Sequence, residues 1–494
     1  MHKLLYILLL TSICAVAQAQ DESAEDERYT DSITGKVVHY FRLSENDTLV
    51  TPDHNALKPI LESMAINFAV WGWDHYVTDR GWADVDGKIV RRNLKHDWVL
   101  DTDSYSGNQF SHPFHGSMFY NAARYHGLNY YQSALYPLVG SMVWEYFCER
   151  NPPSYNDFLS TGIGGSAIGE TTHRITDLVF DDSKRGASRV MRELFGTLLN
   201  PARGVHRLIS GESWHVRPSR GRHEDPEPFT FDFGAGTRYV HAMRGDHHTK
   251  NIPYIDFNVN YGDRLEKKDK PKPYDFFRVH LLINLGGGNP TFNDLDIRGR
   301  LLSHQFGDVD GWRHDLGLYQ VYRYIDNYNT DGDDRPGQFA LINEACSFGG
   351  GIYSEKRNAH SIFSHELMVD AIGFGGTTAD YFQPRRYDFG SGFSARDEVR
   401  YVLNRRLTVG DDFYYARLFV PKGPEDPGNR GNTYWGDQGY NSIFYNKAYL
   451  QLTIIPRLRL DAEHVLYYRR SGYKHFSNVH AKSYEVKMGL VYSM

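Results

Sequence analysis

The chain ends in Tyr484-Glu485-Val486-Lys487-Met488-Gly489-Leu490-Val491-Tyr492-Ser493-Met494, and this stretch decides the fold. Its even-numbered positions are apolar or aromatic, whereas Glu485, Lys487 and Ser493 fall on the other face. Such alternation predicts a β-strand with one apolar face. About eleven similar stretches lie upstream. Together they predict a closed barrel whose apolar face meets the lipid of a bacterial outer membrane.

The first residues have the pattern of an export signal. Lys3 precedes an apolar run at residues 4–13, and Ala17-Gln18-Ala19 fits a small-residue cleavage site. We expect residues 1–19 to be a signal peptide and residues 20–55, which begin polar and acidic, to be a flexible lead-in. After the signal, every stretch of about 18 residues contains charge, Pro or Gly, so a helical membrane span is not expected.

Three further segments follow from the change in periodicity. Residues 56–216 have helical composition, residues 217–228 have the composition of a linker, and residues 229–494 alternate with period two. The predicted fold class is therefore α+β, with an N-terminal α-helical domain before a transmembrane antiparallel β-barrel of about 12 strands. A soluble β-sandwich with one buried face is the alternative.

The connections between the predicted strands differ in length in a regular way. Short connections at 307–311, 355–359, 404–406 and Pro456 alternate with long ones, at 326–338, 374–388 and 421–441. Short periplasmic turns and long outer loops are typical of outer-membrane barrels. The segment 264–274 is the exception, because it should be a periplasmic turn and yet is long and rich in lysine.

Ionisable residues interrupt the apolar stretches of the helical domain. We take seven of them as candidate site residues: His112, His115, Glu145, Glu149, Asp157, Glu170 and His173. A carboxylate or imidazole among apolar neighbours must be paired, metal-bound or neutralised. This set could bind a divalent metal or supply an acid and a base for hydrolysis. In the alternative, arginines pair with the acids and the network is structural; the candidate partners are Arg124, Arg174, Arg189 and Arg192.

Several spaced motifs carry a resemblance to known families. They are His112-Pro113-Phe114-His115-Gly116-Ser117, Ala122-Ala123-Arg124, Trp144-Glu145-Tyr146, Pro153-Ser154 with Asp157, and Gly169-Glu170. Over roughly residues 60–215 the chain resembles a family of Bacteroidota envelope proteins catalogued only as a domain of unknown function. That resemblance implies an exported protein with a barrel-like C-terminal part and no established activity. The Glu-rich helix and the Ser-x-x-Asp step are also similar to VanZ-like membrane proteins, although the Asn expected after the Asp is missing.

Two weaker patterns lie in the predicted barrel. Residues 327–332 imitate the first half of a calcium loop, but Gln338 stands where the bidentate Glu is needed. His365, His464 and Ser303 share the parity of lipid-facing residues, where outer-membrane lipases and deacylases place a His and a Ser.

Two hypotheses about function remain open. In the first, the protein is a non-enzymatic envelope component that binds or conducts a ligand, with the helical domain as plug or adaptor on the periplasmic side. In the second, it is an envelope hydrolase or lipid-modifying enzyme that uses the His/Glu cluster. The expected partners are outer-membrane lipid and a small-molecule or lipid ligand of unknown identity. The net charge of −6 gives no reason to expect nucleic acid binding. The sequence identifies no cofactor or metal.

Overall fold

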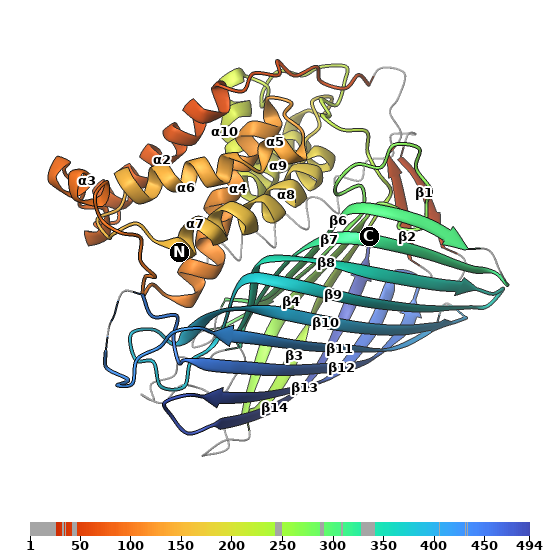
Figure 1. Cartoon of the computed structure of the whole chain (residues 1–494). Helices are drawn as coiled ribbons and strands as arrows, with labels where there is room; N and C mark the ends of the chain where they lie inside the picture. Colours follow the sequence, from red (N-terminus) through yellow and green to blue (C-terminus); the bar gives the residue numbers. More distant parts are fainter. Residues whose placement is uncertain are drawn as a thin grey trace. The chain divides into compact units, whose positions relative to one another are not determined.

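The computed structural model in Figure 1 describes residues 26–31, 34, 36–41, 47–242, 249–286, 291–307, 310–327, 341–404, 406–429, 431 and 433–494. Within these ranges the chain forms two compact units. The barrel unit comprises Arg28–His39, Leu100–Phe110 and Pro228–Met494. The helical unit comprises mainly Tyr40–Val99 and Ser111–Glu227.

Twelve of the described strands close into an antiparallel barrel. From β3 to β14 each strand pairs with the next in sequence, and β3 pairs with both β4 and β14, which closes the sheet. The predicted fold class is therefore confirmed. The strands are β3 (Phe229–Ala242), β4 (Thr249–Tyr261), β5 (Phe277–Asn284), β6 (Phe292–Gly307), β7 (Trp312–Asp326), β8 (Leu341–Arg357), β9 (Ser361–Thr378), β10 (Tyr387–Leu403), β11 (Leu407–Val420), β12 (Gly439–Ile455), β13 (Leu458–Tyr473) and β14 (Val479–Ser493).

The alternation in β14 orients its side chains as the sequence predicts. Val486, Met488 and Leu490 are 40–49% exposed on the outer face, whereas Glu485 and Lys487 are buried on the inner face. On β9, too, exposed Leu367 and Val369 alternate with buried Glu366 and Asp370, so this outer wall is apolar as well. This is the arrangement that a lipid environment requires.

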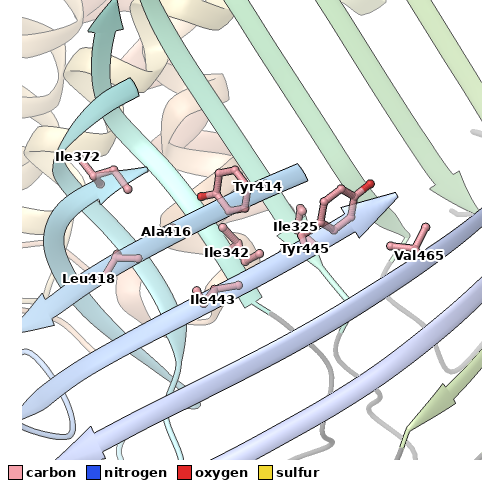
Figure 2. Packing of buried hydrophobic residues seen from close by; sticks show 9 residues of the cluster. All are labelled: Ile325, Ile342, Ile372, Tyr414, Ala416, Leu418, Ile443, Tyr445 and Val465. Carbon is pink, nitrogen blue, oxygen red and sulfur yellow. The ribbon is translucent and has the colours of Figure 1, made fainter. Parts of the chain in front are cut away.

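The lumen is filled by side chains, and part of the filling is apolar. Figure 2 shows the inner apolar cluster, which lies on the inward-facing positions of six strands. Its members are Ile325, Ile342, Ile372, Tyr414, Ala416, Leu418, Ile443, Tyr445 and Val465. Arg323 stacks on the Tyr414 ring, with its guanidinium carbon 4.1 Å from the ring centroid. This cluster joins the polar part of the lumen through that cation–π contact.

The two ends of the barrel differ as predicted. The turns at 308–311, 358–360, 404–406 and 456–457 are short and share one end, which we call the short-turn end. The connections at 379–386 and 421–438 share the other end with the shorter turn at 474–478, and we call it the long-loop end. The exceptional connection, residues 262–276, lies at the short-turn end. Its Arg264 is buried against inward-facing residues of the wall, so its length reflects folding into the lumen.

The predicted lead-in contains a hairpin. Strands β1 (Asp26–Thr30) and β2 (Val37–Phe41) continue the sheet beyond β3, where His39 pairs with Phe229. The tip of this hairpin reaches two distant parts of the wall at the short-turn end. Lys36 Nζ lies 3.0 Å from Asp232 of β3, and Asp31 lies 2.7 Å from Arg357 at the end of β8. The hairpin tip therefore crosses the short-turn mouth of the barrel.

The segment Leu100–Phe110 covers the outer wall at the long-loop end. Tyr105 donates a 3.1 Å hydrogen bond to the carbonyl of Ile325, and its ring stacks 5.1 Å from that of Tyr324. Tyr324 points outward, because its neighbours Arg323 and Ile325 face the lumen. The sequence predicts this segment as part of the helical domain, whereas in the structure it belongs to the barrel unit.

The helical unit is a bundle of short helices. They are α2 (Lys58–Tyr76), η1 (Gly81–Ala83), α3 (Gly87–Asn93), α4 (His112–Tyr125), α5 (Tyr130–Ser133), α6 (Tyr136–Phe147), α7 (Tyr155–Leu159), η3 (Ser160–Gly164), α8 (Gly165–Val179), α9 (Gly186–Leu199) and α10 (Pro201–Ser210); a π-helical turn, η2 (Gly107–Ser111), precedes α4. No helix in the described ranges is long and apolar enough to cross a membrane.

Helices α4 and α8 pack with their backbones in contact. A Cβ atom built on Gly116 would lie 2.0 Å from the carbonyl oxygen of Thr161, and one on Gly165 would lie 2.8 Å from Gly116 Cα. Only glycine fits at this approach. The close packing places the polar residues of α4 directly against those of α7 and α8.

Candidate functional site

The first group of candidate residues meets at the start of α7. Ser154 is the N-cap of that helix, and its Oγ donates to the carboxylate of Asp157. Asp157 also accepts a 2.9 Å bond from Asn156, and its Oδ1 lies 3.5 Å from His112 Nε2. Glu145 accepts a 2.8 Å bond from the backbone N–H of Ser154. The fold therefore brings three predicted residues together around Ser154.

This arrangement does not activate a serine nucleophile. In a nucleophile–base pair the hydroxyl donates to the imidazole, which removes its proton. Here the Ser154 hydroxyl donates to Asp157, and Asp157 separates it from His112. The contact is instead a helix N-cap closed by an acidic residue three positions on, which stabilises the first turn of α7.

Two other predicted residues lie nearby in an aromatic setting. Burial lowers the pKa of His115 to about 3, so its ring is neutral at pH 7. That ring contacts the edge of Trp144 at 5.0 Å, and among the described groups its Nε2 has no hydrogen-bond partner. Glu149 accepts a 3.1 Å bond from the indole N–H of Trp144 and a 2.8 Å bond from Asn151.

Glu170 forms a separate and fully paired group, which we call the Glu170 network. Its carboxylate accepts 2.8 Å bonds from Arg124 and Arg174, and a 2.7 Å bond from the hydroxyl of Tyr120. Arg124 reaches onward to Glu224 at 2.6 Å. Burial, followed by the Glu170 charge, holds the pKa of the Tyr120 hydroxyl well above its usual range. The two arginines are partners named in the structural alternative, and for Glu170 the geometry favours that alternative.

His173 shares a helix face with Glu170 but lies among cations. Burial, and then the charges of Arg124 and Arg203, lower the pKa of His173 well below its usual value. Asp177, one turn on, accepts a 2.7 Å bond from Arg203 and bonds from backbone N–H groups of residues 223 and 224. Burial disfavours its charge, but these contacts outweigh burial and lower its pKa. The cationic surroundings of Glu170 and His173 favour the structural alternative over a metal site for this Glu-x-x-His pair.

The helical unit contains a further group that the sequence does not predict. Glu62, His126 and His206 bring one ligand atom each to within 4.8 Å of one another. Their positions in the sequence follow no metal-binding spacing, so no local pattern could have identified them. A weak signal was present, because His126 precedes Gly127 at the end of a predicted helix.

The lumen contains the second candidate site, a set of ion pairs that bridge its walls. Arg278 of β5 lies 3.2 Å from Glu366 of β9 and 3.1 Å from Glu398 of β10. Arg396 of β10 lies 2.7 Å from Asp296 of β6. Four strands separate β5 from β10 along the wall, so these pairs join distant parts of the barrel. We call them the cross-lumen ion pairs.

The 262–276 connection adds to the same network from the short-turn end. Arg264 lies 2.6 Å from Glu366 and 3.2 Å from Asp315, and donates a 2.8 Å bond to the hydroxyl of Tyr319. Charged groups on facing surfaces thus neutralise one another, as buried charges must.

The structure also shows where the residues of the two weaker barrel patterns lie. His365 pairs with Asp397 on the outer face at 2.8 Å. The predicted parity of Ser303 is wrong, because a bulge between Arg300 and Leu302 turns it to the inner face, where Gln305 donates to it. The calcium-like pattern lies outside the described residues from position 328 onward.

Comparison with known proteins finds a family match for one part of the chain. Residues 97–202 match the family described as a domain of unknown function, DUF3943. The expected resemblance to a family of unknown function is confirmed for these residues, while the likeness to VanZ-like proteins stays a prediction. Among curated proteins, none matches the sequence.

The barrel is similar to several solved outer-membrane proteins. The NanC porin has 10% identity and a TM-score of 0.27, covering 52% of this chain and 98% of the porin. An outer membrane channel from Pseudomonas putida F1 has 9% identity and a TM-score of 0.27, covering 54% of this chain and 94% of the channel. The toluene transporter TodX of P. putida has 8% identity and a TM-score of 0.21, covering 55% and 90%. TM-scores this low carry no argument, so the barrel is defined by its own strand pairing.

Proposed function

We propose that the protein is an outer-membrane barrel whose lumen is closed in this structure and opens to pass small charged solutes. The observation that carries the proposal is the bridge from Arg278 to Glu366 and Glu398. A barrel of twelve strands has a wider interior than one of eight, which side chains alone can fill. Here the interior is occupied by charges of both signs rather than by a continuous apolar core. Buried ion pairs add little stability compared with apolar packing, which favours a role for these charges as a gate or a binding site.

The barrel unit supplies its own closing elements. The hairpin tip crosses the short-turn mouth through Lys36 and Asp31, and Arg264 anchors the 262–276 connection inside. Each is held by polar contacts that a charged solute can replace. Because these segments occupy the lumen, we assign the helical domain the role of an adaptor rather than of the main plug.

The opening of the lumen can be tested by planar-bilayer recordings of the full-length protein. We expect the parent chain to be closed for most of the recording. Replacing Arg278 by alanine removes the shorter of two bridges between Glu366 and Glu398, since Arg298 lies 3.6 Å from both. Conductance should rise several-fold and favour cations, because exposed carboxylates select cations. Arg278→Lys keeps the charge and should stay closer to the parent.

The matched control is Arg313→Ala. Arg313 also pairs with a glutamate, Glu355 at 2.7 Å, but its side chain is 47% exposed at the short-turn end. Its removal should leave conductance unchanged. A parent chain that forms a large, permanently open pore would sink the proposal, as would an Arg278→Ala chain with the parent's conductance.

For orientation, we propose that the short turns face the periplasm and the long loops face the exterior. The sequence also predicts that the helical domain lies on the periplasmic side. The packing of Leu100–Phe110 at the long-loop end argues against that side for this segment.

Labelling of intact cells with a membrane-impermeant maleimide decides the orientation. Cys148 and Cys346 are both buried and should not react. An engineered Asn429→Cys in the 421–438 loop should be labelled, and His360→Cys in the 358–360 turn should be protected. Ser106→Cys should react like Asn429→Cys. Lys95→Cys reports on the helical domain, and its labelling would overturn the periplasmic assignment.

A further inference from the structure

Three side chains from distant parts of the sequence converge in the helical unit. Glu62 Oε1 lies 2.8 Å from His126 Nε2 and 3.3 Å from His206 Nδ1. All three ligand atoms lie within 4.8 Å of one another. Zinc bonds to nitrogen and oxygen of about 2.0–2.2 Å give ligand atoms about 3.3 Å apart in a tetrahedral site. Two of the three spacings are already near that value.

The local fold fixes each of these side chains. Glu62 lies in the first turns of α2, His206 lies on α10, and His126 is the C-cap of α4. Gly127 follows with φ +78°, and a Cβ there would lie 2.2 Å from Pro52 Cγ. The chain around residue 52 can therefore approach the end of α4 closely, which brings Asp53 against His126.

Asp53 completes the arrangement from the far side of the ring. Its Oδ1 accepts a 2.9 Å bond from His126 Nδ1. With a metal bound, this bond would keep the proton on Nδ1 and leave the Nε2 lone pair free to bind the ion beside Glu62. Metal-binding histidines almost always donate their other ring N–H to a carboxylate or carbonyl in this way. The position of Asp53 therefore supports a bound metal independently of the spacing within the cluster.

The ring of His206 is also held in place. It packs on the ring of Tyr125 with centroids 3.7 Å apart, and the hydroxyl of Tyr125 donates a 2.8 Å bond to Glu212. The side chains of Glu62 and His206 remain 32% and 27% exposed. Water can therefore reach a fourth coordination position.

We infer that Glu62, His126 and His206 bind a divalent transition-metal ion, with Asp53 orienting His126. Two imidazoles and one carboxylate suit zinc, and three protein ligands leave one position for water or a substrate oxygen. Without a metal the same contacts form a protonated histidine held between two carboxylates. Burial disfavours the charge of Glu62, but its hydrogen bonds to His126 and His206 lower its pKa to about 2. The inference is independent of how the barrel opens.

The test is a zinc titration of the full-length protein in detergent after removal of metal by chelation. A competing chromophoric chelator reports affinity, and Co²⁺ substitution reports four-coordinate geometry through its visible absorption. The parent chain should bind one Zn²⁺. Glu62→Gln and His206→Ala, both at partly exposed positions, should lose saturable binding while keeping the parent's circular dichroism. Asp53→Asn keeps all three ligands and should weaken binding about 10–100-fold.

The matched control is His96→Ala, because His96 is an exposed histidine of the same unit outside the cluster. It should bind zinc like the parent. Absence of saturable binding in the parent would overturn the inference. Binding that persists unchanged in folded Glu62→Gln and His206→Ala chains would overturn it as well, since the zinc would then lie elsewhere.

Discussion

Glu170→Gln should destabilise the helical unit by about 3–5 kcal/mol, the usual cost of removing one partner from a buried ion pair. The substitution preserves shape and removes only the charge. Arg124 and Arg174 would then face each other's charge with a neutral amide between them, in a site where Glu170 itself is fully buried. Arg124 keeps Glu224 as a second acidic partner.

Urea unfolding of the helical unit measures this effect. Loss of helical circular dichroism at 222 nm reports the unit, and the gel mobility of unheated samples shows that the barrel is intact. Asp97→Asn is the control, because it makes the same kind of change at an exposed carboxylate and should alter stability by less than about 0.5 kcal/mol. A Glu170→Gln chain as stable as this control would mean that the network does not hold the helices together.

The same variant separates the two original hypotheses for Glu170. If the residue acted in catalysis or bound a metal, its neutral replacement would abolish activity without a large loss of stability. Because Glu170 is paired with two arginines, we expect a large loss of stability instead. Removing one partner of a buried ion pair leaves the other charge unpaired and is strongly destabilising. A large loss of stability in the Glu170→Gln chain would therefore identify the network as structural.

The sequence predicted the barrel because alternation along a strand is a local property. In β14 the pattern of Val486, Met488 and Leu490 against Glu485 and Lys487 alone determines which face meets lipid. Alternation fails where the backbone departs from regular geometry. The bulge after Arg300 reverses the facing of Ser303, and no feature of the sequence marks its position.

The contents of the lumen and the helical sites depend on contacts between distant residues. Composition showed that Glu170 needs a partner, and Arg124 and Arg174 were among the candidates. Nothing local indicated that Glu62 would meet His126 and His206, because those contacts arise from the packing of α2, α4 and α10. The cross-lumen ion pairs were hidden for the same reason, since closure of the sheet determines which strands face each other.

The central claim is that lipid surrounds the barrel while side chains fill it. Spin labels placed one at a time along β14 test both halves, in a chain whose Cys148 and Cys346 are replaced by alanine. Labels at Val486, Met488 and Leu490 should collide readily with oxygen, which concentrates in lipid. Labels at Ser483 and Val491, which face inward, should be poorly accessible to oxygen and to a water-soluble nickel complex alike. Strong collisions with the nickel complex at the inward positions would show an open aqueous pore, and a scan without alternation would contradict the barrel in its membrane.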